Sequence, residues 1–129
     1  MISGPIGTRV TVRDLFGNVP ARRKFLRQTT TESAYIQRIV TAYASAYPSV
    51  QFALTTDGRR TIATDGSGSL QAAAVGAFGI DVGRTLIELG ELDSVAAVPG
   101  VSVSGWVVAP EITRSHRQDM HFFVNGCWI

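Results

Sequence analysis

Four basic side chains lie within six residues in the first quarter of the sequence, and their spacing suits the binding of phosphate groups. They are Arg22, Arg23, Lys24 and Arg27. Like charges on a short helix repel one another unless an anion is near, and each charge placed against a phosphate releases counterions and adds sequence-independent affinity for a nucleic acid. The alternative is that one or two of them pair with a carboxylate such as Asp14 or cap the short helix. Contact with a DNA backbone is the favoured interpretation, and Arg38 on the next helix could extend the patch.

Positive charge is concentrated in the first half of the chain. Residues 1 to 60 carry nine basic and three acidic side chains, whereas residues 61 to 129 carry three basic and seven acidic ones. Eleven of the twelve basic residues are Arg, whose planar fork suits bidentate phosphate contacts better than a Lys ammonium does. Genome composition or solubility would explain an excess of Arg equally well. The charge counts alone therefore leave DNA binding open.

Other residue types that carry chemistry are scattered. His116 and His121 lie five residues apart with no Cys beside them, which is too few ligands for a zinc motif. Cys127 is the single cysteine, so it cannot form an internal disulfide, and a lone cysteine on a strand is more often a packing residue than a reactive thiol. The acidic residues near turns form no acid–base pair of the kind that catalysis needs; they are Asp14, Asp57, Asp65 and Asp81. We therefore predict no catalytic residues and no metal site.

Length and hydropathy indicate one soluble domain. The chain has 129 residues, of which 45% are hydrophobic, enough for one core but not for two complete domains. No signal peptide is apparent, and no apolar run approaches the roughly 20 residues needed to span a bilayer. We expect an intracellular protein without a membrane partner.

The elements that must position the basic residues begin with a strand. Residues 8 to 15 alternate between apolar and polar side chains, as in a half-buried strand, and Pro20 after a Gly-Asn turn suits the first turn of a short helix. A second helix is predicted from about residue 31 to 47, where Thr29-x-x-Glu32 has the pattern of a capping box. Its apolar residues recur at helical spacing; they are Ile36, Ile39, Val40, Tyr43 and Tyr47.

The rest of the chain alternates between strands and one more helix. A β-hairpin is predicted from about 50 to 64 around Asp57-Gly58, and a helix from Ser69 to Phe78. Strands follow at 85–92, 100–108 and 121–129, with an exposed loop at 111–119. This order favours an α/β or α+β layer with two helices on a mostly antiparallel or mixed sheet.

Two motifs resemble the MutL family of DNA mismatch repair proteins. Residues 7 to 27 read GTRVTVRDLFGNVPARRKFLR, which is similar to the last motif of the family's N-terminal ATPase domain and the start of the transducer domain that follows it. The closing run Met120 to Gly126, MHFFVNG, is similar to a strand of that transducer. Gly105 and Pro110 lie between these landmarks where the family tends to have them. The resemblance spans nearly the whole chain.

The resemblance implies a fragment and a fold. Residues 1–19 would be the end of a GHKL ATPase domain, and residues 20–129 a transducer domain truncated at its C-terminal end. The implied fold, as in gyrase B, is a four- to five-stranded mixed sheet with two helices on one face and a left-handed βαβ crossover. The magnesium-binding helix, the adenine site and the lid of such ATPases would lie upstream and the transducer lysine downstream. The fragment is therefore expected not to hydrolyse ATP and to bind no cofactor of its own, whereas the parent would use ATP and Mg.

The resemblance also implies roles for individual residues. Lys24 and Arg27 match basic residues of the family's DNA groove, with Arg22, Arg23 and Arg38 as further DNA-binding candidates, and Gly7 and Thr8 would line the parent's nucleotide pocket. Cys127 stands where the family usually has Arg, which places that groove contact in doubt. The implied function is the coupling of ATP binding and dimerisation of the parent to sequence-independent DNA binding and to signalling with a MutS-type partner, in the bacterial cytoplasm. The alternatives are a small basic module that docks an acidic protein, or the transducer of a type II topoisomerase.

Overall fold

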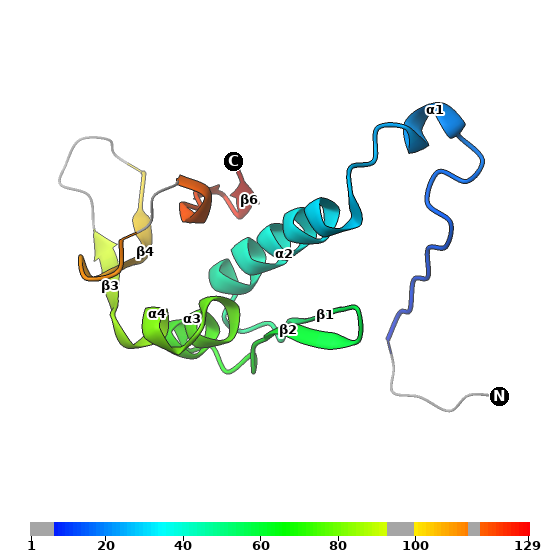
Figure 1. Ribbon diagram of the computed structural model, residues 1–129. Helices are drawn as coiled ribbons and strands as arrows, with labels where there is room; N and C mark the ends of the chain where they lie inside the picture. Colours follow the sequence, from blue (N-terminus) through cyan, green and yellow to red (C-terminus); the bar gives the residue numbers. More distant parts are fainter. Residues whose placement is uncertain (1–6, 93–99, 114–116) are drawn as a thin grey trace. The chain divides into compact units, whose positions relative to one another are not determined.

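The computed structural model describes residues 7–92, 100–113 and 117–129 and shows helices and short antiparallel strands in alternation (Figure 1). The chain divides into two compact units, residues 1–32 and residues 33–129. This composition confirms the α+β class. The elements in chain order are α1 (Pro20–Arg23), α2 (Thr29–Ala46), β1 (Ala53–Thr56), β2 (Arg59–Ala63), α3 (Leu70–Phe78), α4 (Ile80–Arg84), β3 (Leu86–Leu92), β4 (Val103–Val108), a 3-10 turn η1 (Arg117–Asp119), β5 (Phe123–Val124) and β6 (Cys127–Trp128).

The first unit holds α1 and an extended segment. Pro20 occupies the first turn of α1 as predicted, since its missing N–H has no partner there in any helix. The strand predicted over residues 8 to 15 is not present, because none of the described residues pairs with it. Val10 and Val12 are 81% and 70% exposed. Alternation by itself does not make a strand when the backbone has no neighbour to bond with.

Helix α2 begins two residues earlier than predicted and without the predicted capping box. The Glu32 carboxylate accepts a hydrogen bond from the backbone N–H of Arg27 at 2.9 Å, not from Thr29. The helix ends at Ala46, ahead of Pro48, as expected from the clash of a proline ring with a continuing helix. Its buried residues are small; they are Thr41, Ala42, Ala44 and Ser45. The larger apolar residues Ile36 and Ile39 stay about half exposed, at 51% and 46%.

The β1–β2 hairpin confirms the prediction from Asp57-Gly58. Both turn residues have positive φ, 50° and 76°, as a two-residue turn of this twist requires. Thr64 closes the open end: its backbone N–H donates to the carbonyl of Phe52 and its hydroxyl donates to that of Val50. Thr64 is only 4% exposed, so these bonds satisfy a buried polar group.

Helix α3 packs against β2 and α4. The Ser69 hydroxyl accepts a hydrogen bond from the Ala72 N–H at 3.2 Å and caps the helix as predicted. Ala73 and Ala74 are buried, and Gly76 lies so near β2 that a side chain there would collide with the Ala63 carbonyl oxygen. Small residues on α3 therefore allow the close approach of the two elements.

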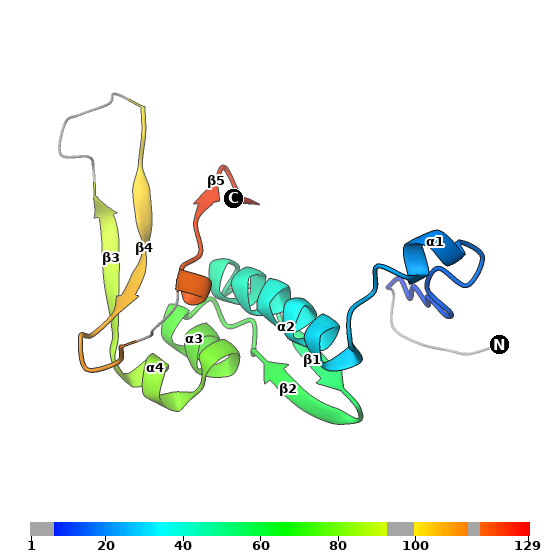
Figure 2. The same ribbon diagram turned by 45° about the horizontal axis from the view of Figure 1, so that its top comes forward.

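The strands form three separate sheets of two antiparallel strands each within the described residues: β1 with β2, β3 with β4, and β5 with β6. Figure 2 shows β3 and β4 lying side by side, with the register running from Leu86 opposite Val108 to Leu92 opposite Val103. The strand predicted over 121–129 is the short β5–β6 hairpin, with Asn125 and Gly126 in its turn at φ 49° and 78°. The four- to five-stranded mixed sheet and its left-handed crossover are not confirmed.

Candidate nucleic-acid interface

The cations of the first unit are exposed to solvent. We call residues 22–27 the basic segment; all six of its residues are exposed. Helix α1 supplies Arg22 and Arg23 in its last turn, and Lys24 follows at its end. Among the described residues, none of these three side chains has a carboxylate partner, so the predicted alternative of pairing with Asp14 is not observed. The segment presents a short row of exposed cations of the kind that binds phosphates through charge.

Phe25 lies in the middle of the basic segment and is 84% exposed. Phenylalanine is among the residue types most often buried in proteins, and Phe25 departs from that general preference. An aromatic ring among cations is the composition of surfaces that stack on exposed bases. One exposed ring supplies no stacking platform by itself, and the cations remain the stronger signal.

Arg38 belongs to the second unit and is partly buried. Its guanidinium carbon lies 5.8 Å from the centre of the Trp128 ring, within the range of a cation–π interaction. Its Nε is buried and has no hydrogen-bond acceptor among the described residues. Arg38 therefore lies against an aromatic ring, and its role in DNA binding stays a prediction.

The β5–β6 hairpin is held to α2 by side chains that the sequence pattern does not identify as a group. The Tyr47 hydroxyl donates a 2.7 Å hydrogen bond to the carbonyl of Gly126. The Tyr43 ring meets Phe123 and Trp128 edge to face at 5.7 and 6.5 Å, a favourable arrangement for aromatic rings. The helical spacing of the two tyrosines is the available signal, and it does not indicate a partner 79 residues away.

His121 precedes β5 and lies among aromatic rings. Its ring is 5.7 Å from Trp128 and 6.2 Å from Phe78, centre to centre. Burial lowers the pKa of His121 from its usual 6.5, the positive charge of Arg38 lowers it further, and Asp119 acts in the opposite direction. The imidazole is therefore neutral at neutral pH, and its Nδ1 is buried without a partner among the described residues.

The remaining predicted site residues lie apart from these groups. Gly7 and Thr8 are exposed and belong to no helix or strand, so their assignment to a nucleotide pocket stays a prediction. Cys127 is exposed on β6. No group of three or more His, Cys, Asp or Glu residues within the described ranges is placed to hold a metal ion.

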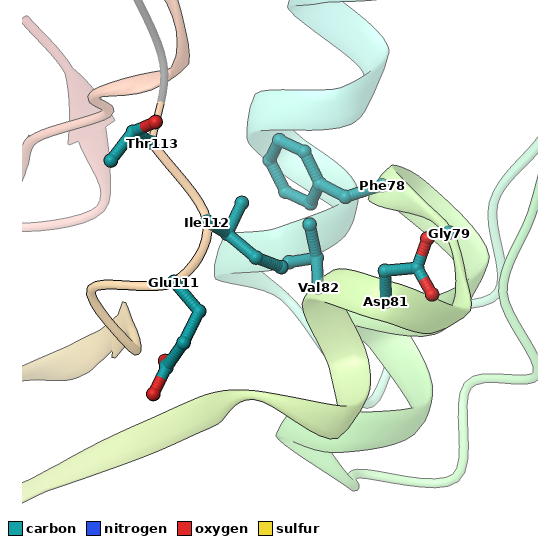
Figure 3. A pocket seen from close by; sticks show the side chains of 7 residues that line it. All are labelled: Phe78, Gly79, Asp81, Val82, Glu111, Ile112 and Thr113. Atoms are coloured by element: carbon teal, nitrogen blue, oxygen red, sulfur yellow. The ribbon is translucent and has the colours of Figure 1, made fainter.

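One shallow pocket of about 340 Å³ lies between α4 and the segment after β4 (Figure 3). Ile112 points toward Phe78 and Val82, which give the pocket an apolar floor. The carboxylates of Asp81 and Glu111 lie on opposite sides of it. Since the two acids do not converge, this arrangement supplies neither a catalytic pair nor a cation site.

Similar proteins were found by comparison of the sequence. The chain is 46% identical over 123 residues to the DNA mismatch repair protein MutL of Halobacterium salinarum, which covers 95% of this chain and 18% of that protein. It is 44% identical over 126 residues to MutL of Desulforudis audaxviator, a match that covers 98% of this chain and 21% of that protein. It is 36% identical over 129 residues to MutL of Streptococcus uberis, a match that covers 100% of this chain and 19% of that protein. No family model matches the chain.

These similarities cover nearly all of this sequence but little of each relative. The chain spans about one fifth of the length of the curated relatives that it matches. Within the described residues, no helix is both long enough and apolar enough to cross a membrane.

Proposed function

Since the chain belongs to the MutL family of DNA mismatch repair proteins, of whose length it spans about one fifth, we propose that it binds the DNA backbone without sequence preference through its basic segment. The observation that carries the proposal is the row of exposed cations at residues 22–27. Each of them can neutralise a phosphate and release counterions, and this contribution to affinity does not depend on base sequence. Lys24 and Arg27 are the main contacts, with Arg22 and Arg23 adding to the field.

The same proposal places the segment within a larger protein. The chain would take the transducer role, including the mixed sheet with the left-handed crossover, and would couple ATP binding and dimerisation of the parent to DNA and to a MutS-type partner. The names of the relatives support a repair function, and the coupling is our inference. Gly7 and Thr8 are exposed, and their place in the nucleotide pocket of the parent stays a prediction.

A salt titration of DNA binding tests the proposal. Fluorescence anisotropy with a duplex of arbitrary sequence should give an affinity that falls steeply as salt rises. Reversal of two charges in the variant Lys24→Glu/Arg27→Glu should weaken binding and reduce the slope of log K against log salt by about 0.9 for each phosphate that is no longer neutralised. Two arbitrary duplexes of different sequence should bind equally.

The matched control reverses two exposed charges elsewhere. Arg59 and Arg60 are exposed on β2, so Arg59→Glu/Arg60→Glu changes the net charge by the same amount and should leave the salt slope nearly unchanged. An affinity that ignores salt, or equal losses of affinity in both double variants, would show that the basic segment is not the DNA-binding surface. No DNA binding at low salt would favour the alternative of a module that docks an acidic protein.

A further inference from the structure

Two nitrogen atoms of basic side chains in the second unit have hydrogen-bonding capacity that no described residue uses. They are Nε of Arg38 on α2 and Nδ1 of His121 ahead of β5, and both are buried. A buried polar atom without a partner is unfavourable, and such atoms in native proteins usually have a protein group, a water or an ion as partner. Two of them on neighbouring basic groups point to a ligand that accepts hydrogen bonds.

The two groups meet at one aromatic side chain. The Arg38 guanidinium carbon is 5.8 Å from the centre of the Trp128 ring, and the His121 ring is 5.7 Å from it. The ring of Phe78, at the end of α3, lies 6.2 Å from the ring of His121, centre to centre. Aromatic surroundings lower the local dielectric constant and so strengthen the attraction between a cation and an anion.

We propose that Arg38 and His121, held beside Trp128, form a binding site for a phosphate group. The side edge of a guanidinium offers Nε–H and one Nη–H as a fork that pairs with two oxygens of one phosphate. A tetrahedral phosphate has further oxygens, beyond the two in the Arg fork, that can accept from His121, whereas a carboxylate has only the two oxygens that the fork already engages. The site lies in the second unit and does not involve the basic segment on which the proposed function rests.

Binding at this site is coupled to a proton on His121. Burial and Arg38 lower the pKa of His121, and Asp119 of η1 is the acidic group that opposes them. A bound phosphate adds negative charge near the imidazole and raises this pKa, because a nearby opposite charge favours the charged form. By linkage, an anion whose charge is constant binds more tightly as the pH falls through the pKa of His121.

The test uses Trp128 as the reporter in the full chain. The chain has two tryptophans, so the background variant Trp106→Phe leaves Trp128 alone. Inorganic phosphate, titrated at constant ionic strength against chloride, should give a saturable change in Trp128 emission. Arg38→Gln should weaken phosphate binding about tenfold or more, as expected for loss of a charge-assisted hydrogen bond. Arg38→Lys should recover part of it, and Arg59→Gln on the exposed face of β2 should leave it unchanged.

A second readout follows His121 directly. The NMR resonance of its ring protons should titrate at higher pH in sulfate than in chloride. Sulfate is used because its charge is constant over this pH range. In Arg38→Gln the two anions should give the same pKa for His121. A response that does not saturate, that chloride reproduces, or that survives in Arg38→Gln with a folded circular dichroism spectrum would overturn the proposal. Binding of acetate as tight as that of phosphate would also overturn it, in favour of a protein carboxylate.

The source of the phosphate is resolved with DNA. If a duplex raises the pKa of His121, the phosphate is that of a nucleic acid backbone. If inorganic phosphate raises it and the duplex does not, the site takes a free phosphate. The assay with inorganic phosphate should give the same result in Lys24→Glu/Arg27→Glu, so failure of the proposed DNA contact and failure of this site are separate outcomes.

Discussion

At the scale of single residues, His121 makes stability depend on pH. Its pKa in the folded chain is below the usual 6.5, first because of burial and then because of Arg38. As the pH falls through 6.5, the unfolded chain takes up a proton before the folded chain does, which favours unfolding. The contribution of His121 to the free energy of unfolding is thus fully present above about pH 6.5. It is lost progressively as the pH falls below that value toward the lower pKa of His121 in the folded state.

Urea unfolding at pH 7.5 and pH 5.5 measures this loss. The unsubstituted chain should have a lower urea midpoint at pH 5.5 than at pH 7.5. His121→Gln should reduce the difference between the two midpoints, because it removes the proton uptake of His121 in the unfolded state. Arg59→Gln is the control, because Arg59 is exposed on β2 and an arginine does not titrate between these pH values; it should keep the full difference. An unchanged difference in His121→Gln would mean that other groups carry the pH dependence.

Residue roles can be predicted from sequence where they depend on local charge and not where they depend on distant contacts. The basic segment is apparent from six consecutive residues, and these prove to be exposed. The polar neighbours of Arg38 on its helix predict a polar face, yet its guanidinium lies against Trp128, 90 positions later. Nothing in the spacing around Arg38 indicates that ring, since tertiary contacts leave no local periodicity.

At the scale of elements, prediction succeeds where local chemistry determines the structure. Asp57-Gly58 predicts the β1–β2 hairpin, and Ser69 predicts the start of α3. The prediction for segment 8–15 fails because a strand is defined by its partner, and no described residue pairs with it. Helix α2 lies close to the predicted place but buries small residues, so the helical spacing of Ile36 and Ile39 identifies the helix without identifying its contacts.

The contact between α3 and β2 offers a test of packing at this scale. A Cβ on Gly76 would collide with the carbonyl oxygen of Ala63 and lie 3.0 Å from Thr64 Cγ2. Because the first of these is a backbone atom, it cannot turn away. Gly76→Ala gains about 1 kcal/mol of helix propensity, but overpacking costs roughly 1–3 kcal/mol, so the variant should be destabilised in thermal unfolding.

Gly90→Ala is the matched control for that substitution. Gly90 lies in β3, and a Cβ there would meet nothing within 4 Å. This variant should unfold at the same temperature as the parent sequence or slightly above it, because Gly in a strand interior is itself unfavourable. Equal melting temperatures for Gly76→Ala and the unsubstituted chain would show that α3 and β2 lie further apart than described.

At the scale of the whole molecule, the chain divides between residues 32 and 33, inside the first turn of α2. The predicted domain boundary after residue 19 stays a prediction, since a division by contacts does not identify the domain of a longer protein to which each residue belongs. The two units differ in kind. The first has no described strand and no described buried residue, whereas the second contains all of the buried hydrophobic residues that the structure describes.

Limited trypsin digestion should therefore cut the first unit before the second. Proteases need a segment that can leave the fold locally, and exposed chain with few buried contacts does so at little cost. The first cuts should follow the basic residues of the first unit, which are Arg9, Arg13, Arg22, Arg23, Lys24 and Arg27. Arg59 and Arg60 lie in a paired strand and should be cut later, as mass spectrometry of the early fragments would show.

Addition of duplex DNA separates a DNA contact from mere exposure. If the basic segment holds the backbone, DNA should slow the cuts after residues 22–27 and leave those after Arg9 and Arg13 nearly unchanged, and high salt should remove this protection because the contacts are electrostatic. Uniform protection of all sites would indicate that DNA inhibits the protease. Protection of Arg59 and Arg60 with none at residues 22–27 would move the DNA contact to the second unit and contradict the proposed function.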